Sequence, residues 1–291
     1  MRITAAVGQL APGEDARANW SVAVRLLEQA ADAGARLAVL PEQTMLAQRA
    51  GDPARFASLV REAWAWWPDA LSDAARRLGL FVVAGGFAAS DRPGAGGSAS
   101  GIGAGLSGVL AEGAEGPREH DPRPWNVLLA VDAGGGVVAC QPKTRLYDAF
   151  AYRESDMVRA GPRLVSGSGS QVVDLAGIAF GLVNCYELRF PELARGMVAA
   201  GAQALALGAA WVRGPLKEDQ WVTLARARAI ENCAYVLAAG TRAKDTIGRS
   251  MIIDSGGVVV AGLADEPEGL AVAVIDTDRV AEARTRSRSL P

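Results

Sequence analysis

The chain has 291 residues, of which half are apolar and 21% are charged, a composition typical of a soluble globular enzyme built as one large domain or two small ones. Its 30 basic and 32 acidic residues nearly cancel, so nothing indicates binding to nucleic acid or to an anionic membrane surface. No apolar run approaches the ~18 residues of a membrane span, and the three cysteines are too far apart for a zinc site, so we expect reduced thiols in a cytoplasmic protein.

The first part of the chain alternates strand patterns with helical patterns. Strands are predicted over 3–10, 36–40 and 80–84, and helical sequence over 15–33 and 53–78. Gly34 is placed to end the first helix, and Gly85-Gly86 to end the third strand.

Residues 90–120 are dominated by Gly, Ser, Ala and Pro, and we interpret them as a flexible surface insertion. The segment 103–108 matches GxGxxG, but no strand precedes it and no good helix follows, which counts against a dinucleotide site. His120, the single histidine, lies in a charged, proline-bounded stretch and is interpreted as a solvated loop residue rather than a catalytic base. A histidine-based metal site would lack ligands.

The remainder of the chain predicts many strands and two helices. Strands are expected over 125–131, 136–140, 172–175, 178–183, 203–207, 235–239, 250–254, 257–260 and 270–275, and helices over 192–200 and 215–232. Turn sequences at 132–136 and 254–257 indicate hairpins, and therefore mixed strand directions. The tail 276–291 is interpreted as a peripheral C-terminal arm.

An internal repeat indicates the architecture. Ala33-Gly-Ala-Arg-Leu-Ala-Val-Leu40 and Ala200-Gly-Ala-Gln-Ala-Leu-Ala-Leu207 share one helix–Gly–Ala–strand register. Two similar halves would stack their sheets face to face with helices outside, as a four-layer α-β-β-α sandwich of the α/β class. A doubly wound Rossmann-like sheet is the alternative, but the hairpins count against it.

Three reactive side chains follow directly after apolar strands: Glu42, Lys143 and Cys185. Cys185 lies at a predicted strand-to-helix turn, where amide N–H groups and a nearby cation would favour the nucleophilic thiolate. The alternative is a buried, inert cysteine, with Glu42 as a helix cap and Lys143 as a solvated lysine. Reactive groups gather at strand ends because the sheet holds them rigidly.

The segments Leu40-Pro-Glu-Gln43, Lys143-Thr-Arg-Leu-Tyr-Asp148 and Asn184-Cys-Tyr-Glu-Leu-Arg-Phe-Pro-Glu192 resemble, in order, the Glu, Lys and Cys motifs of the nitrilase superfamily of carbon–nitrogen hydrolases. The segment with Glu154 is similar to the one that carries the family's second active-site glutamate. The resemblance implies a carbon–nitrogen hydrolase domain over 1–275, the sandwich fold, a homodimer, and neither metal nor organic cofactor. Gln141-Pro142 and Arg145 depart from the lysine motif, which bears on substrate shape.

The resemblance also implies a mechanism. Glu42 takes the thiol proton as Cys185 attacks a carbonyl carbon, and the resulting thioester is hydrolysed by water. Lys143 and the backbone N–H of Tyr186 would stabilise the oxyanion, and Glu154 would hold Lys143.

The run after Cys185 resembles the amidase branches, including the omega-amidase and deaminated-glutathione-amidase-like groups, so we expect hydrolysis of a small carboxamide to an acid and ammonia. Tyr186, Trp211 and Arg213 are candidate pocket residues. Arg189 or Arg213 would bind a substrate carboxylate, or instead form an internal salt bridge. The alternatives are N-carbamoyl hydrolysis or acyl transfer on the same triad, and a non-enzymatic scaffold that keeps the fold.

Overall fold

The computed structural model describes residues 1–48, 51–89, 121–150, 152–161 and 172–287. The predicted insertion over 90–120, with its GxGxxG segment and His120, lies outside the described residues. The other predicted strands and helices fall within them.

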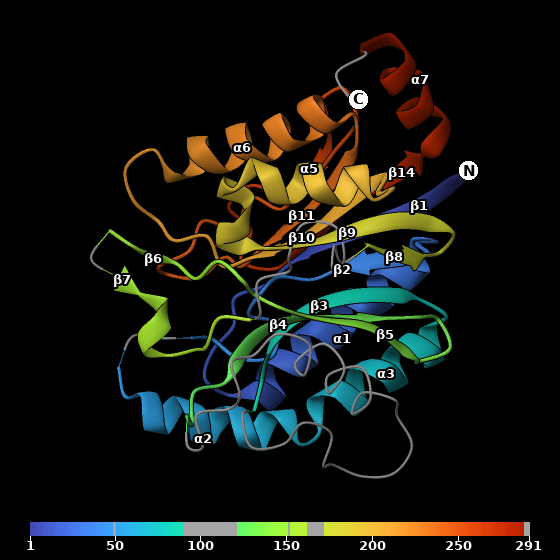
Figure 1. Ribbon diagram of the computed structural model, residues 1–291. Helices are drawn as coiled ribbons and strands as arrows, with labels where there is room; N and C mark the ends of the chain where they lie inside the picture. The colour runs from blue at the N-terminus through green and yellow to red at the C-terminus, as the bar shows by residue number, and fades with distance from the viewer. Residues whose placement is uncertain (49–50, 90–120, 151, 162–171, 288–291) are drawn as a thin grey trace.

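The first sheet has six described strands in the order β14-β1-β2-β3-β4-β5. Their bounds are β1 (Arg2–Gln9), β2 (Leu37–Val39), β3 (Phe81–Ala88), β4 (Trp125–Val131), β5 (Val137–Pro142) and β14 (Gly269–Asp276). Strands β1, β2 and β3 are parallel, β4 is antiparallel to β3, and β5 is antiparallel to β4, so β2 and β5 end at the same edge. Helices α1 (Ala16–Asp32), α2 (Pro53–Trp64) and α3 (Trp67–Leu78) cover its outer face (Figure 1).

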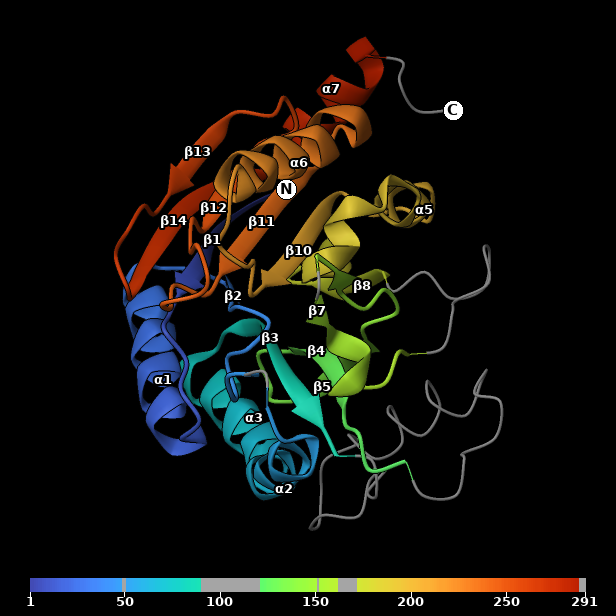
Figure 2. The same cartoon turned by 90° about the vertical axis from the view of Figure 1, so that its left-hand side faces the viewer.

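The second sheet, again among described residues, has the order β13-β12-β11-β10-β9-β8. Its strands are β8 (Val172–Leu175), β9 (Ile178–Asn184), β10 (Ala204–Ala209), β11 (Tyr235–Gly240), β12 (Met251–Ile253) and β13 (Val259–Gly262), and α5 (Pro191–Ala199) and α6 (Lys217–Asn232) cover its outer face (Figure 2). Short elements complete the chain: β6 (Asp148–Ala149), β7 (Tyr152–Arg153), the 3-10 turns η1 (Glu154–Asp156) and η2 (Cys185–Arg189), and α7 (Thr277–Ser287).

Apolar side chains fill three separate layers. Between the sheets lie side chains such as Val39 and Phe180. Trp67 packs between the first sheet and its helices, and Trp221 between the second sheet and its helices. Because alternate residues of a strand point to opposite faces, each central strand contributes to two of these layers. The predicted four-layer α-β-β-α sandwich is confirmed.

The internal repeat has a matching geometry in the two halves. Gly34, after α1, has φ 74°, and Gly201, after α5, has φ 106°, a region that glycine enters without steric cost. In the first half the Ala35 N–H donates to the carbonyl of Ala30, and in the second half the Ala202 N–H donates to the carbonyl of Met197. The same type of helix C-terminus therefore precedes β2 in one half and β10 in the other.

Among the boundaries that differ from the prediction, two have a clear local cause. Strand β3 does not end at Gly85-Gly86 but continues to Ala88. The glycine is needed for close approach instead, because a Cβ on Gly85 would lie 2.2 Å from the carbonyl oxygen of Glu42. The helical stretch 53–78 is two helices, and α3 begins anew around Trp67-Pro68, since proline favours the first turn of a helix.

Candidate active site

The eight predicted site residues all line one cavity of about 600 Å³. They are Glu42, Lys143, Glu154, Cys185, Tyr186, Arg189, Trp211 and Arg213. The cavity lies at the edge where β2, β5, β9 and β10 end, so its walls come from both sheets. Carboxyl ends of parallel strands meet at one edge of a sheet, which explains why residues so distant in sequence come together here.

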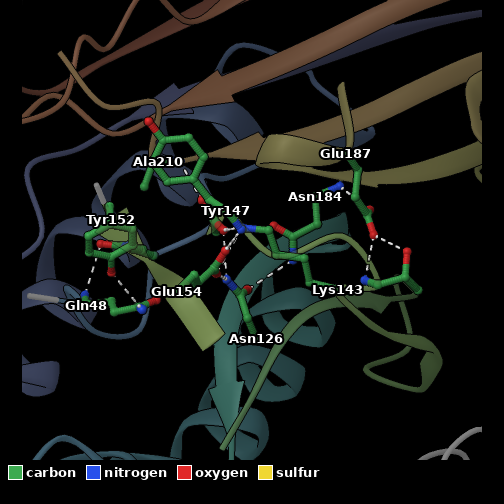
Figure 3. A network of polar contacts seen from close by, with 12 residues as sticks. Gln48, Asn126, Lys143, Tyr147, Tyr152, Glu154, Asn184, Glu187 and Ala210 are labelled. Atoms are coloured by element: carbon green, nitrogen blue, oxygen red, sulfur yellow. Dashed lines mark hydrogen bonds and ion pairs between the residues drawn. The ribbon is translucent and has the colours of Figure 1, made fainter. Parts of the chain in front are cut away.

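Lys143 lies between two carboxylates. Its Nζ donates to Oε1 of Glu42 at 2.7 Å and lies 2.9 Å from Oε2 of Glu154. Figure 3 shows Lys143 beside Glu154 and Asn126 in this network. Burial lowers the pKa of Lys143, but the charges of Glu154 and Glu42 outweigh it and raise the pKa well above its usual value. Lys143 therefore carries a positive charge in the interior.

The Glu42 carboxylate accepts hydrogen bonds on both oxygens. Oε1 accepts from Nδ2 of Asn126 at 2.7 Å in addition to Lys143, and Oε2 accepts from the backbone N–H of Ala210 at 2.8 Å. Burial raises the pKa of Glu42, whereas the Lys143 charge and hydrogen bonds from Lys143, Cys185 and the Ala210 N–H lower it, and the lowering prevails. Glu42 is therefore an ionised base that faces the cavity.

Cys185 opens the 3-10 turn η2 with φ 47°, a conformation that side-chain-bearing residues rarely adopt. It is 7% exposed. Burial, together with the negative charge of Glu42, raises the pKa of the Cys185 thiol well above its usual value despite the opposing effect of Lys143. The expectation that the donors of this turn and a nearby cation favour the thiolate is therefore wrong: the sulfur rests as a thiol.

Glu187 connects the cysteine turn, which is η2 with the preceding Asn184, to the segment that follows Lys143. Its Oε2 accepts the backbone N–H of Asn184 at 2.9 Å, and its Oε1 accepts the backbone N–H and the hydroxyl of Thr144 at 2.7 and 2.8 Å. Thr144 directly follows Lys143, so this one buried carboxylate fixes the lysine relative to Asn184, the residue before Cys185. Arg228 supports the turn from α6, donating from Nε to the carbonyl of Leu188 at 3.0 Å.

Some contacts of the site were missed at the level of sequence. Asn126 and the N–H of Ala210 both contact Glu42, and the Tyr152 hydroxyl, which lines the cavity, accepts from Nε2 of Gln48 at 3.0 Å. Asn126 had one available signal, since it is a polar residue inside an otherwise apolar strand. Burial and Glu154 raise the pKa of Tyr152 to about 12, so its hydroxyl stays protonated.

Three cationic side chains, Arg189, Arg213 and Lys217, line the cavity on a part that we call its outer wall. Arg189 donates from Nη2 to Gln220, and Arg213 donates from Nε to the carbonyl of Thr246. Lys217 lies 3.9 Å above the ring of Phe150. Among the described residues, no carboxylate lies within ion-pair distance of Arg189 or Arg213, so the internal salt bridges considered as the alternative do not form there.

Within the described ranges, no group of three or more His, Cys, Asp or Glu side chains is arranged to hold a metal ion. None of the helices described here has the length and apolar character that crossing a bilayer requires.

The carbon-nitrogen hydrolase family model matches residues 4–285. The chain belongs to the carbon-nitrogen hydrolase family. It is 44% identical over 164 residues to the deaminated glutathione amidase of Escherichia coli O157:H7, a match that covers 56% of this chain and 60% of that protein, less than two thirds of it. A Mycobacterium tuberculosis protein named only as a hydrolase is 33% identical and is matched over 98% of this chain and 93% of its own length.

Among solved structures, an amidase of Nesterenkonia sp. AN1 superposes with a TM-score of 0.71 and 21% identity, covering 98% of this chain and 94% of that one. That structure, of a mutant of the amidase, shows covalent addition of the acetamide moiety of fluoroacetamide at the active site cysteine of that enzyme. The likeness supports the carbon-nitrogen hydrolase fold, and the family makes this protein a hydrolase of carbon–nitrogen bonds. The homodimer and the cytoplasmic location stay predictions.

Proposed function

We propose that the protein hydrolyses a small carboxamide to a carboxylic acid and ammonia, with Cys185 as nucleophile, Glu42 as general base and Lys143 as electrostatic stabiliser. The observation that carries the proposal is the buried Lys143–Glu42 ion pair of 2.7 Å in the same cavity as the Cys185 thiol. An ionised carboxylate beside a protonated thiol is the arrangement that general-base activation of a nucleophile requires.

In the first step, the Cys185 sulfur attacks the amide carbon as its proton passes to Glu42. The carbonyl π electrons move to the oxygen, and the tetrahedral oxyanion forms beside the Lys143 ammonium and the N–H groups that open η2, including that of Tyr186. Such a donor, preorganised in a dry site, typically lowers the barrier by about 3–4 kcal/mol.

In the second step, the C–N bond breaks and protonated Glu42 returns its proton to the departing nitrogen, which leaves as ammonia. Water then attacks the thioester carbon while Glu42 accepts one of its protons. The C–S bond breaks, the acid is released, and the proton returns to the sulfur. Glu154 supports both steps by holding Lys143, and its Oε2 also accepts the Tyr147 N–H at 2.6 Å.

The cations of the outer wall support a substrate that carries a carboxylate. The guanidinium groups of Arg189 and Arg213 line the cavity with donors suited to a planar anion, and Tyr186 and Trp211 add aromatic walls. The buried Nε of Arg189 has no hydrogen-bond partner among the residues that the structure describes. A carboxylate on the substrate would satisfy that nitrogen.

Ammonia release from a panel of omega-amides and N-carbamoyl compounds tests the proposal. We expect ammonia and free acid from at least one omega-amide, and a loss of at least about 10³-fold for Cys185→Ala. The variant Cys140→Ala is the matched control, because Cys140 is a buried cysteine that does not line the cavity. Turnover of carbamoyl compounds alone would favour the carbamoyl alternative, and undiminished turnover by Cys185→Ala would rule out the thioester mechanism.

A further inference from the structure

We propose that Asn126 is the positioning residue that orients the Glu42 carboxylate toward the cysteine turn, by joining the two sheets through its side-chain amide. The inference rests on the proposed function, because it gives Asn126 a role in the same reaction. Asn126 is fully buried on β4 of the first sheet, whereas the cysteine turn follows β9 of the second.

Both hydrogens of the Asn126 amide are used by carboxylates. Nδ2 donates to Oε1 of Glu42 at 2.7 Å and to Oε1 of Glu154 at 3.1 Å. Ionised carboxylates only accept hydrogen bonds, so the amide can face them only with its nitrogen. The two negative charges therefore fix which way the Asn126 amide points.

The oxygen of the same amide reaches the other sheet. Oδ1 of Asn126 accepts from Nδ2 of Asn184 at 3.0 Å (Figure 3), and Asn184 directly precedes Cys185. The positive φ of Cys185 has to be held by its surroundings, since the backbone does not favour it. One neutral side chain thus sets the base and the residue before the nucleophile in a fixed relation.

The hydrogen bonds on the two oxygens of Glu42 decide which oxygen is available to accept a proton. A carboxylate oxygen accepts about two hydrogen bonds. Counting donors from the described residues, Oε1 accepts from Lys143 and Asn126, so it is filled, whereas Oε2 accepts the Ala210 N–H alone and keeps a lone pair. The geometry therefore makes Oε2 the oxygen that takes the Cys185 proton.

A neutral amide suits this place better than a charged donor would. Hydrogen bonds to the ionised form of a carboxyl group favour that form, so the Nδ2 bond to Oε1 helps to keep Glu42 ionised beside Lys143. A second cation would make Glu42 a weaker base. Losing the amide donor would instead raise the pKa of Glu42.

The test compares Asn126→Ala and the isosteric Asn126→Asp with Asn232→Ala. Asn232 is equally buried, but its Nδ2 donates to the carbonyl of Arg228 within α6 and it does not line the cavity. The measurement is the rate of Cys185 alkylation by iodoacetamide against pH, normalised to the folded fraction from circular dichroism, together with ammonia release.

We expect both Asn126 variants to slow alkylation and turnover by roughly 10–100-fold, as loss of a hydrogen bond to a charged group typically does, and to move the acid limb of the alkylation profile to higher pH. Asn232→Ala should lower stability and leave that limb in place. An unchanged limb in both Asn126 variants, or an equal shift in Asn232→Ala, would overturn the inference. Because alkylation needs no substrate, wild-type protein that alkylates with this profile but releases no ammonia would refute the proposed function alone.

Discussion

At the scale of single residues, the chemistry of the site depends on the balance of charge around one thiol. Glu42 and Glu154 flank a single lysine, so the buried cluster carries net negative charge before any substrate binds. That charge explains why burial of Cys185 gives a thiol and why the proposed mechanism uses Glu42 as a base. A site with one more cation would have favoured the thiolate instead.

The pH dependence of kcat/KM follows from these shifts. Glu42 must be ionised, and because its pKa is lowered from 4.5, activity should be lost only as the pH falls below that value. Lys143 must be charged and Cys185 protonated, and both pKa values are raised, above 10.5 and 9.0 respectively, so activity should persist until the pH rises past about 9. We expect a flat profile between about pH 5 and pH 9. A fall in kcat/KM centred near pH ~6.5, the usual pKa of histidine, would show that another group controls the reaction.

The site residues divide into those that local sequence predicts and those that only the fold reveals. Glu42, Lys143 and Cys185 were predictable because each follows an apolar strand and lies in a short motif. The Ala210 N–H could not be predicted, since a backbone group leaves no mark in the sequence. The pKa of Cys185 was predicted in the wrong direction, because the turn showed the nearby donors while the buried carboxylate comes from another strand.

At the scale of elements, β3 explains how Glu42 reaches the site. The turn after β2 passes directly over Gly85, which lies in the interior of β3 rather than at its end. Sequence reasoning predicted a strand end from the two glycines, because glycine commonly marks turns. Glycine in a strand also marks close backbone approach, and only the neighbouring strand shows which of the two applies.

Gly85→Ala should therefore damage folding and activity together. The added Cβ would lie 2.2 Å from the carbonyl oxygen of Glu42 and 2.3 Å from its Cα, and backbone atoms cannot move aside as a flexible side chain can. We expect a loss of stability of about 1–3 kcal/mol or more, with Glu42 displaced. Urea unfolding and kcat/KM measure the two effects.

Gly196→Ala is the matched control, since the residue lies within α5 and a Cβ there would have, beyond its own helix, no described atom within 4 Å. Alanine in a helix interior should stabilise the protein by about 0.5–1 kcal/mol and leave activity intact. If Gly85→Ala had wild-type stability and activity, this would contradict the close approach of β3 to the turn after β2.

At the scale of the whole molecule, the two similar halves contribute different chemistry to one cavity. The first half supplies Glu42, Lys143 and Glu154, and the second supplies Cys185 and the cation Arg189. The repeated helix–Gly–Ala–strand register predicted that the halves stack, because the same register forms the same helix end twice. It could not predict the cavity walls, which depend on the loops that differ between the halves.

The excess of cations on the outer wall predicts which amides the cavity prefers. Arg189 and Lys217 both line it, and the pKa of Lys217 is lowered by burial and by the charge of Arg189, a repulsion that a bound anion would relieve. We expect an omega-amide with a free carboxylate to react with a KM roughly 10-fold or more below that of its methyl ester, as one charge-assisted contact provides. Steady-state kinetics on the matched pair give this ratio.

Arg189→Leu should raise KM for the carboxylate substrate, leave KM for the ester nearly unchanged, and so remove the discrimination between them. Arg145→Leu is the control, because Arg145 is a nearby cation that lies over Phe190 and outside the cavity lining. If the wild-type protein hydrolyses the ester as well as the free acid, the cations of the outer wall do not select the substrate, and the aromatic side chains Tyr147, Tyr186 and Trp211 then set its shape. A cavity of about 600 Å³ is larger than a simple amide needs, so the discrimination must come from a part of the substrate that lies beyond the reacting bond.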